Sequence, residues 1–312
     1  MNLKPASQTK LYGLKKNFNE ITNLFDSNKL PNKILLTGPK GSGKSTISYH
    51  IINYIFSIKE DYPYNTKLNE IDNKNKSYGL IKNGSHPNFH LIDLIDDKKN
   101  IEISQIRKMI DYTNKSSFNG SSRLILINNV ENLNTNSSNA LLKIIEEPNE
   151  KVFFILIHNN NKKIIDTLKS RCLAFKINLN FEQSISITNQ LLKENIFDLI
   201  NNDLINYYST PGDYINLVNF SKKNDINLNE FNLKKFLFFL INENYYKKDN
   251  FIKLNIFNYI ELYFLKIFNQ TIYKNSIDSF YTKFIYKIND TNKFNLDYES
   301  LFMEFKSKIL NG

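Results

Sequence analysis

The chain has 312 residues, 41% of them hydrophobic and 13% aromatic, which allows more than one domain with a buried core and excludes intrinsic disorder. Cys172 is the only cysteine, no apolar run could cross a membrane, and the first residues lack a signal-peptide core, so we expect a cytoplasmic protein without disulfides or membrane contact. The formal net charge of +10 is spread along the chain as lysines, so it favours a general DNA-binding protein only weakly.

The N-terminal region predicts an amphipathic helix, then a strand, a glycine-rich loop and a second helix. Apolar residues recur at helical spacing from Phe18 to Phe25, and residues 34–37 form a short apolar run typical of a buried parallel strand. After the loop, helical spacing continues to Phe56. The loop fits the pattern G-x-x-x-x-G-K-[ST] and consists of Gly38, Pro39, Lys40, Gly41, Ser42, Gly43, Lys44, Ser45 and Thr46.

This loop predicts a nucleotide-binding site. Its glycines let backbone N–H groups turn toward phosphate oxygens, and the N-terminus of the following helix adds partial positive charge. Lys44 would reach the terminal phosphates, and Ser45 would ligate magnesium. The alternative is a glycine-rich turn without a ligand. The complete pattern in its strand–loop–helix context favours weak binding of ATP or ADP with Mg²⁺.

Residues 58–85 are polar, rich in asparagine and lysine, and lack a clear period, so we interpret them as an insertion. His86 and His90 follow this stretch. No cysteine lies nearby to complete a metal site, so we interpret both as ordinary surface or capping histidines. The sequence therefore predicts that the side chains of this region form no metal site.

Strands and helices alternate from residue 86 to residue 177. This alternation indicates an α/β protein with a parallel sheet covered on both faces. We expect Ser104 to be the N-cap of the first helix in this region. The predicted strands are 89–93, 123–127, 152–157 and 173–177, and the predicted helices are 103–110, 135–146 and 164–168.

From residue 178 onward the sequence predicts helices alone, with three apolar stripes in the last third. The simplest interpretation is a helical bundle with its own core, and an exposed apolar face of such a bundle could also join subunits. The stripes contain Ile256, Ile260, Phe264 and Ile267; Phe280, Phe284 and Ile288; and Leu301, Phe302, Phe305 and Ile309.

Several motifs together resemble bacterial clamp-loader ATPases of the AAA+ class. The resemblance covers residues 1–177 well, the next helices moderately, and the last third only by length and helicity. It implies an AAA+ P-loop core at 1–177, a small helical lid at 178–225 and an all-α collar at 226–312 that joins subunits. The motifs are the glycine-rich loop, Gly84-Ser85-His86-Pro87, residues 103–107, Asn139-Ala140-Leu141-Leu142-Lys143 running into Glu146-Glu147-Pro148, and Ser170-Arg171-Cys172.

Two departures from this family's pattern concern metals and catalysis. The zinc-binding cysteines that many members carry before residue 85 are absent, so we expect no zinc. Motor subunits place an aspartate and a glutamate after the strand at 123–127, for magnesium and the attacking water, but this chain has Asn128 and Asn129. An amide carries no charge to attract magnesium and cannot act as a general base. Nucleotide binding can survive this change, but we expect no intrinsic ATPase activity.

The resemblance also assigns sensor-like positions to His158, Asn159 and Asp213. Asp213 lies in a segment where active members present an arginine to the nucleotide, and its carboxylate would repel phosphate. No arginine occurs in residues 178–312. Two of the three usual sources of catalytic charge are therefore expected to be missing.

Arg171 is the predicted catalytic residue, acting on a neighbouring subunit. It follows a short helix, and one interpretation is that it only caps the last carbonyls of that helix. Lysine would do so nearly as well, and this chain uses arginine only at Arg107, Arg123 and Arg171. We therefore expect Arg171 to be an arginine finger that acts in trans on ATP in an adjacent motor subunit.

Together, the residues and the resemblance predict a non-catalytic, stator-like clamp-loader subunit of a DNA polymerase III holoenzyme. The expected partners are motor and delta-type subunits in a hetero-oligomer and, through that complex, the sliding clamp and primed DNA. A hydrolytically active motor subunit is the alternative, and the intact Lys44 and Ser45 keep it open.

Overall fold

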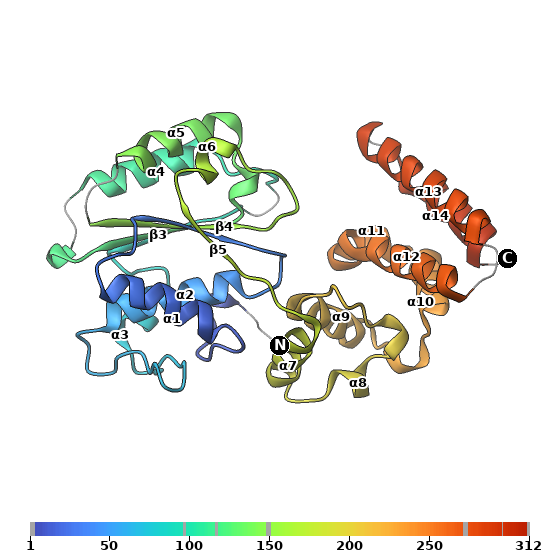
Figure 1. Ribbon diagram of the computed structural model, residues 1–312, viewed down its shortest axis with the longest axis horizontal. Helices are drawn as coiled ribbons and strands as arrows, with labels where there is room; N and C mark the ends of the chain where they lie inside the picture. Colours follow the sequence, from blue (N-terminus) through green and yellow to red (C-terminus); the bar gives the residue numbers. More distant parts are fainter. Residues whose placement is uncertain are drawn as a thin grey trace. The chain divides into compact units, whose positions relative to one another are not determined.

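The computed structural model describes residues 4–95, 98–115, 118–147, 151–270, 274–294 and 296–310. The chain divides into two compact units (Figure 1). The first unit contains the residues up to Leu191 together with Thr210–Gly212, and the second contains Leu192–Ser209 and the residues from Asp213 onward. The first unit is built on a sheet, whereas the described residues of the second unit form helices and turns. The three-part division at residues 178 and 226 stays a prediction.

A five-stranded sheet in the order β2-β3-β4-β1-β5 forms the centre of the first unit. Every neighbouring pair of strands is parallel, which confirms the prediction from the alternation of strands and helices. The carboxyl ends of the strands therefore meet at one edge, where ligands bind in open sheets of this kind. The strands are β1 (Lys33–Thr37), β2 (Phe89–Ile92), β3 (Arg123–Ile127), β4 (Val152–His158) and β5 (Leu173–Lys176).

Helices cover both faces of this sheet, with α1, α2 and α3 on one face and α4, α5 and α6 on the other (Figure 1). Side chains alternate along each strand, so Ile34 and Leu36 join the apolar core with the first set of helices and Leu35 joins the core with the second. Strands buried on both faces are apolar throughout, as the sequence shows. The helices are α1 (Lys15–Asp26), α2 (Lys44–Ser57), α3 (Lys76–Lys82), α4 (Ile103–Asn114), α5 (Thr135–Glu146) and α6 (Asp166–Lys169), and short 3-10 turns lie at Pro5–Ser7, Phe118–Gly120 and Val130–Asn132.

One predicted helix start is wrong. The N-cap of α4 is Glu102 and not Ser104. Gln105 accepts a hydrogen bond on Oε1 from the backbone N–H of Glu102 at 3.0 Å, and this bond fixes the N-cap two residues before Ser104. Ser104 lies inside that turn, where its hydroxyl donates to Glu102 Oε2 at 3.3 Å.

The stretch at 58–85, interpreted above as an insertion, is held to α2 by polar side chains. Asn75 caps α3 by accepting a hydrogen bond from the backbone N–H of Tyr78 at 2.6 Å. The same side-chain oxygen accepts from Nδ2 of Asn53, on α2, at 2.9 Å. Nδ2 of Asn75 donates to the carbonyl of Tyr62 at 2.7 Å. The apolar residues of the stretch add to the core beneath the sheet. Those that are buried are Tyr64, Ile71, Tyr78 and Ile81.

His50 on α2 is a fully buried link between this stretch and the N-terminal residues. Its Nε2 lies 3.1 Å from the carbonyl oxygen of Gln8, and its Nδ1 lies 2.9 Å from the hydroxyl of Tyr64. A carbonyl only accepts, so Nε2 carries the proton and Nδ1 accepts from Tyr64. Burial lowers the pKa of His50 to about 4, against the opposing effect of the hydrogen bond to Gln8.

In the second unit, α10, α11 and α13 pack against α12 (Asn250–Gln270). The ring of Phe264 lies 5.2 Å from that of Tyr281, 5.9 Å from Phe284 and 5.8 Å from Phe305, measured between centroids. Most predicted stripe residues are buried here, whereas the side chain of Ile309 lies outside the described residues. The other helices are α7 (Phe181–Leu192), which ends the first unit, α8 (Ile196–Leu199), α9 (Pro211–Asn224), α10 (Leu233–Asn242), α11 (Tyr245–Lys248), α13 (Lys274–Phe294) and α14 (Tyr298–Phe305), with 3-10 turns at Asn202–Leu204 and Leu228–Glu230 and a π-helical turn at Lys306–Leu310.

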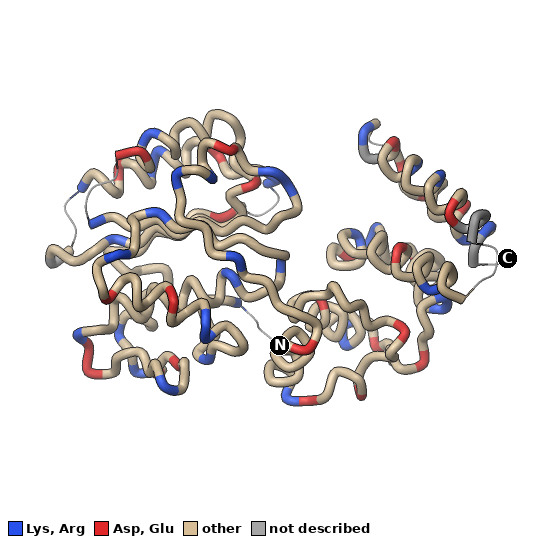
Figure 2. Tube along the Cα trace, in the orientation of Figure 1, with Lys and Arg blue, Asp and Glu red and all other residues tan. Residues whose placement is uncertain are grey.

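Charge and hydropathy along the fold agree with the sequence patterns. Figure 2 shows lysine and arginine interspersed with acidic residues along both units, so positive charge is not gathered in one stretch of either. None of the described helices is both long enough and apolar enough to cross a bilayer. The net charge therefore adds little support to a general DNA-binding protein.

We predict that mild acid destabilises the protein in part through His50. An unfolded histidine, with a pKa near 6.5, takes up a proton well above the folded pKa of about 4, so the unfolded state gains and stability falls as the pH falls through this window. His50→Gln keeps a donor and an acceptor but cannot titrate. Urea titrations at about pH 7 and pH 5 should show the parent losing roughly 2 kcal/mol more than this variant. Equal losses in the two proteins would contradict the assignment.

Candidate nucleotide-binding site

The loop at 38–46 joins β1 to α2 at the carboxyl edge of the sheet. Gly41 and Gly43 have φ angles of +84° and +89°, a left-handed conformation that side chains disfavour. A Cβ atom on Gly38 would lie 2.2 Å from the carbonyl oxygen of Ile177. These glycines allow the backbone to curl in front of the N-terminus of α2, where unpaired N–H groups gather. The loop therefore has the shape of a phosphate cradle.

Lys44 begins α2 and folds its ammonium group back over the loop. Nζ donates to the carbonyl oxygen of Gly38 at 2.8 Å and also to that of Pro39, and the residue is only 3% exposed. Burial lowers the pKa of Lys44 to about 8, and the negative charge of Glu131 opposes this effect. At neutral pH the ammonium group is still mostly charged, so the cradle holds a cation.

A segment far along the chain packs against this loop. Thr210 donates from Oγ1 to the carbonyl of Lys40 at 3.0 Å, and the backbone N–H of Gly212 donates to the carbonyl of Gly41 at 3.1 Å. A Cβ atom on Gly212 would lie 2.7 Å from the Cα atom of Gly41, so only glycine permits this approach. The conformation of the loop thus depends on residues 210–212.

Beside the loop, polar residues that follow β2 and β3 form one hydrogen-bonded network. Asn128 and Asn129 both donate from Nδ2 to the carboxylate of Asp93, to Oδ2 at 2.9 Å and to Oδ1 at 2.7 Å respectively. The hydroxyl of Ser45 donates to Oδ1 of Asn128 at 3.4 Å. The loop is therefore connected to Asp93 through the amide of Asn128.

Asn159, at the end of β4, brings a second carboxylate into this network. Its Nδ2 donates to Oδ1 of Asn129 at 2.7 Å and to Oε1 of Glu131 at 3.0 Å. Its backbone N–H donates to Oε2 of Glu131 at 3.3 Å. Glu131 is only 8% exposed and lies near enough to Lys44 to affect its pKa.

The remaining sensor-like residues lie in different places. His158 reaches the end of β1, where its Nδ1 lies 3.3 Å from Oγ1 of Thr37, while its Nε2 donates to the carbonyl of Lys162 at 2.8 Å. Asp213 belongs to the second unit and lies in the first turn of α9. Its charge adds to the effect of burial in raising the pKa of Tyr214. The structure thus groups the loop with Asn128, Asn129, His158 and Asn159, and the proposed repulsion of phosphate by Asp213 stays a prediction.

Arg171 lies beyond α6, and its guanidinium contacts Glu146 and Thr167, which lie outside the loop. Its guanidinium pairs with Oε1 of Glu146 at 2.8 Å and donates to the carbonyl of Thr167 in α6 at 2.9 Å. The capping contact considered from the sequence is therefore present. The side chain nevertheless keeps 36% of its surface exposed, and such an exposed ion pair contributes only about 0–1 kcal/mol.

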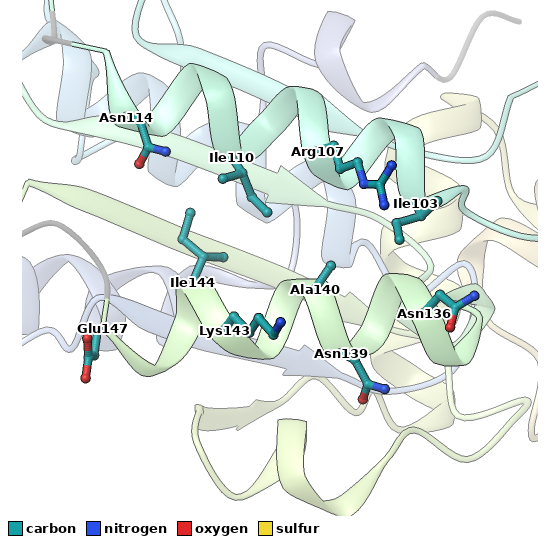
Figure 3. A pocket seen from close by; sticks show the side chains of 10 residues that line it. All are labelled: Ile103, Arg107, Ile110, Asn114, Asn136, Asn139, Ala140, Lys143, Ile144 and Glu147. Atoms are coloured by element: carbon teal, nitrogen blue, oxygen red, sulfur yellow. The ribbon is translucent and has the colours of Figure 1, made fainter.

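The other two arginines have different surroundings. Arg107 lies on the rim of a groove of about 750 Å³ between α4 and α5, in which Ile110 and Ile144 point toward each other (Figure 3). Lys143 adds a second cation to that rim. Arg123 is buried in β3, where Nη1 donates to the carbonyl of Lys115 at 2.7 Å and the guanidinium carbon lies 4.5 Å from the centre of the Tyr112 ring.

The donor set at the loop fits a magnesium nucleotide. The backbone N–H groups and Lys44 suit phosphate oxygens. Magnesium prefers oxygen ligands, and the Ser45 hydroxyl and the Asn128 amide oxygen lie 3.4 Å apart beside the loop. The amide oxygen is neutral, so it would attract the metal less than a carboxylate would. When bound, Mg²⁺ would supply positive charge beside the phosphates.

The parallel sheet, its glycine-rich loop and the polar residues after β2, β3 and β4 define an α/β protein of the P-loop type. The sequence model of the family "DNA polymerase III, delta subunit" matches residues 13–180, more than half of the chain. The chain belongs to this family, which confirms the resemblance drawn from the motifs.

Individual relatives agree with this assignment. A DNA polymerase III subunit delta' from Buchnera aphidicola subsp. Schizaphis graminum (strain Sg) is 33% identical over 59% of this chain and 55% of that protein. A subunit gamma from the same strain is 32% identical over 72% of this chain and 62% of that protein. A gamma subunit-related protein of Thermotoga maritima shares the fold, with a TM-score of 0.52 at 16% identity over 92% of this chain and 97% of that one. The chain thus spans about half to three-fifths of its curated relatives.

Asp93 and Glu131 are the site residues that the sequence patterns missed. Asp93 accepts from Asn128 and Asn129, the amides that stand where motor subunits of the family have acidic residues, and Glu131 accepts from Asn159. Asp93 directly follows β2, and the rule that parallel strands present ligands at their carboxyl ends could have identified it. Glu131 lies in a 3-10 turn beyond β3, where no pattern pointed to it.

We predict that Lys44→Ala weakens binding of ADP or ATP by the purified protein by about 10- to 100-fold, because a charged donor to phosphate is lost. Isothermal titration calorimetry measures this directly. Lys40→Ala is the matched control, since it removes an exposed lysine from the same loop and should bind nearly as the parent does. Equal effects of the two substitutions would show that the cradle does not use Lys44.

Proposed function

We propose that this protein is a stator-like subunit of the replicative clamp loader, within a DNA polymerase III holoenzyme, and that it binds nucleotide without hydrolysing it. Family membership supports the complex, and the loop geometry supports the nucleotide. The observation that carries the proposal is the network beside the loop, in which the amides after β3 donate to Asp93 and the amide of Asn159 donates to Glu131.

Hydrolysis needs a base that can activate water. Asp93 accepts from two side-chain amides and from the backbone N–H of Leu94, and Glu131 accepts on both oxygens from Asn159. Both oxygens of each carboxylate are thus engaged by donors of the protein itself. The carboxylates therefore hold the amides in place rather than activate water. Steady-state ATP turnover by the purified protein that disappears in Lys44→Ala would support an active motor subunit instead.

Arg171 would then supply positive charge to the catalytic site of a neighbouring subunit. Its guanidinium is positioned by two contacts but remains partly exposed, so it can reach a partner without first leaving a buried site. A planar, permanently charged group suits the oxygens of a phosphate during transfer. The proposed partners are motor and delta-type subunits of the loader, and the complex would carry the sliding clamp to primed DNA.

We predict that Arg171→Ala lowers DNA-stimulated ATP hydrolysis at the adjacent motor site by roughly a thousandfold, while the reconstituted complex still assembles. Arg171→Lys should lose most of this activity too, because an ammonium group cannot present the same planar fork. Single-turnover hydrolysis in a complex with one competent motor site measures the effect.

Glu146→Ala is the matched control for Arg171. It removes the exposed ion pair but leaves the guanidinium, so hydrolysis should change little. If a complex carrying Arg171→Ala hydrolyses ATP and loads clamps at the parental rate, the role of Arg171 is only to cap α6.

We predict that the second unit contributes to assembly through the exposed face of α12. Leu254 and Leu265 are 68% and 56% exposed there, and burial of such side chains at an interface is worth about 1–3 kcal/mol each. The double variant Leu254→Ser/Leu265→Ser should keep the parental melting temperature and co-elute less with partner subunits. Lys253→Ser, also exposed on α12, is the control and should co-elute normally. Full co-elution of the double variant would place the assembly surface elsewhere.

A further inference from the structure

Each oxygen of the Asp93 carboxylate accepts a hydrogen bond from a different asparagine at the edge of the sheet. Oδ2 accepts from the side-chain amide of Asn128 at 2.9 Å, and Oδ1 accepts from that of Asn129 at 2.7 Å. Asp93 follows β2, whereas both asparagines follow β3, and these neighbouring parallel strands hold the three residues together. The side-chain amide of Asn128 donates to Asp93 and accepts from Ser45.

This arrangement fixes which end of the Asn128 amide faces the loop. An ionised carboxylate can only accept, so Asn128 must direct its NH₂ group at Asp93. Its oxygen is left for Ser45, whose hydroxyl donates to it at 3.4 Å. With the amide reversed, the NH₂ group would face the Ser45 hydroxyl and would repel a cation there.

We propose that Asp93 is a positioning residue that turns the Asn128 amide oxygen toward Ser45 and so completes a two-oxygen site for the magnesium ion of a bound nucleotide. This inference rests on the proposed nucleotide binding and deepens it. The negative charge that other members of the family place beside the loop is kept one residue further away, behind an amide. Metal binding is thereby retained in weakened form, and the carboxylate is unavailable to activate water.

The substitution Asp93→Asn changes the hydrogen-bonding groups at position 93 but keeps the shape of the side chain. It has nearly the same volume as Asp but offers one acceptor and one donor, so it cannot accept from both Asn128 and Asn129. Replacing a residue that forms a hydrogen bond to a metal ligand typically lowers metal affinity by 10- to 100-fold. In Asp93→Asn, the Mg²⁺ concentration that gives half-maximal enhancement of ADP binding should therefore rise by about 10- to 100-fold.

The experiment measures ADP binding by calorimetry in EDTA and over a Mg²⁺ titration. Asp93→Asn should bind ADP in EDTA as the parent does and lose only the enhancement by Mg²⁺. Asn128→Ala should lose it equally, and the double variant Asp93→Asn/Asn128→Ala should lose no more, because both substitutions interrupt one path. Asp72→Asn, which replaces an exposed carboxylate elsewhere in the same unit, should leave the Mg²⁺ response unchanged.

A double variant that exchanges the residues at positions 93 and 128 tests whether the Mg²⁺ enhancement can be restored. In Asp93→Asn/Asn128→Asp, the new amide can donate to the new carboxylate and still accept from Asn129, so every hydrogen bond is kept and a carboxylate faces Ser45. The Mg²⁺ enhancement should return to the parental level or exceed it. An unchanged enhancement in Asp93→Asn, additive losses in the cycle, or failure of the rescue would each overturn this inference alone. Absence of ADP binding by the parent, with and without Mg²⁺, would overturn both the inference and the proposed nucleotide binding.

Discussion

The buried ammonium group of Lys44 is the interaction on which the site depends. A charge removed from water needs nearby acceptors, and the carbonyls of Gly38 and Pro39 together with the charge of Glu131 provide them. The left-handed conformation of Gly41 and Gly43 lets the loop curl around this ammonium group. The same loop accepts hydrogen bonds from residues 210–212, so its shape is fixed by both neighbouring and distant parts of the chain.

The network next to Lys44 separates two properties that a carboxylate would combine. A carboxylate directly after β3 would attract magnesium and could also polarise water. Here the position after β3 offers a neutral oxygen, and the negative charges of Asp93 and Glu131 lie behind amide donors. Negative charge therefore remains near the loop, while each carboxylate accepts hydrogen bonds from amide groups. This order of groups is the physical basis of the proposed binding without turnover.

The fold was predictable where its causes are local, and the site was predictable only in part. The loop, the strands and α5 (Thr135–Glu146) follow from periods and spacings within short segments. The N-cap of α4 was misplaced because Glu102 and Gln105 form a capping exchange that outweighs the intrinsic preference for Ser104. Asp93 could have been recognised by its place directly after a strand. The hydrogen-bond partners of Asp93 and Glu131 could not be predicted from spacing, since they follow other strands and strand order is a property of the whole sheet.

The three arginines show why rarity alone does not identify a functional residue. Arg123 is buried among backbone carbonyls and against the ring of Tyr112, where a guanidinium is needed for packing and for several donors at once. Arg171 caps α6 and pairs with Glu146, yet a lysine could make either contact. What distinguishes Arg171 is the combination of a fixed guanidinium with an exposed face. The case for a role in trans therefore rests on this geometry, and the scarcity of arginine in the chain adds little to it.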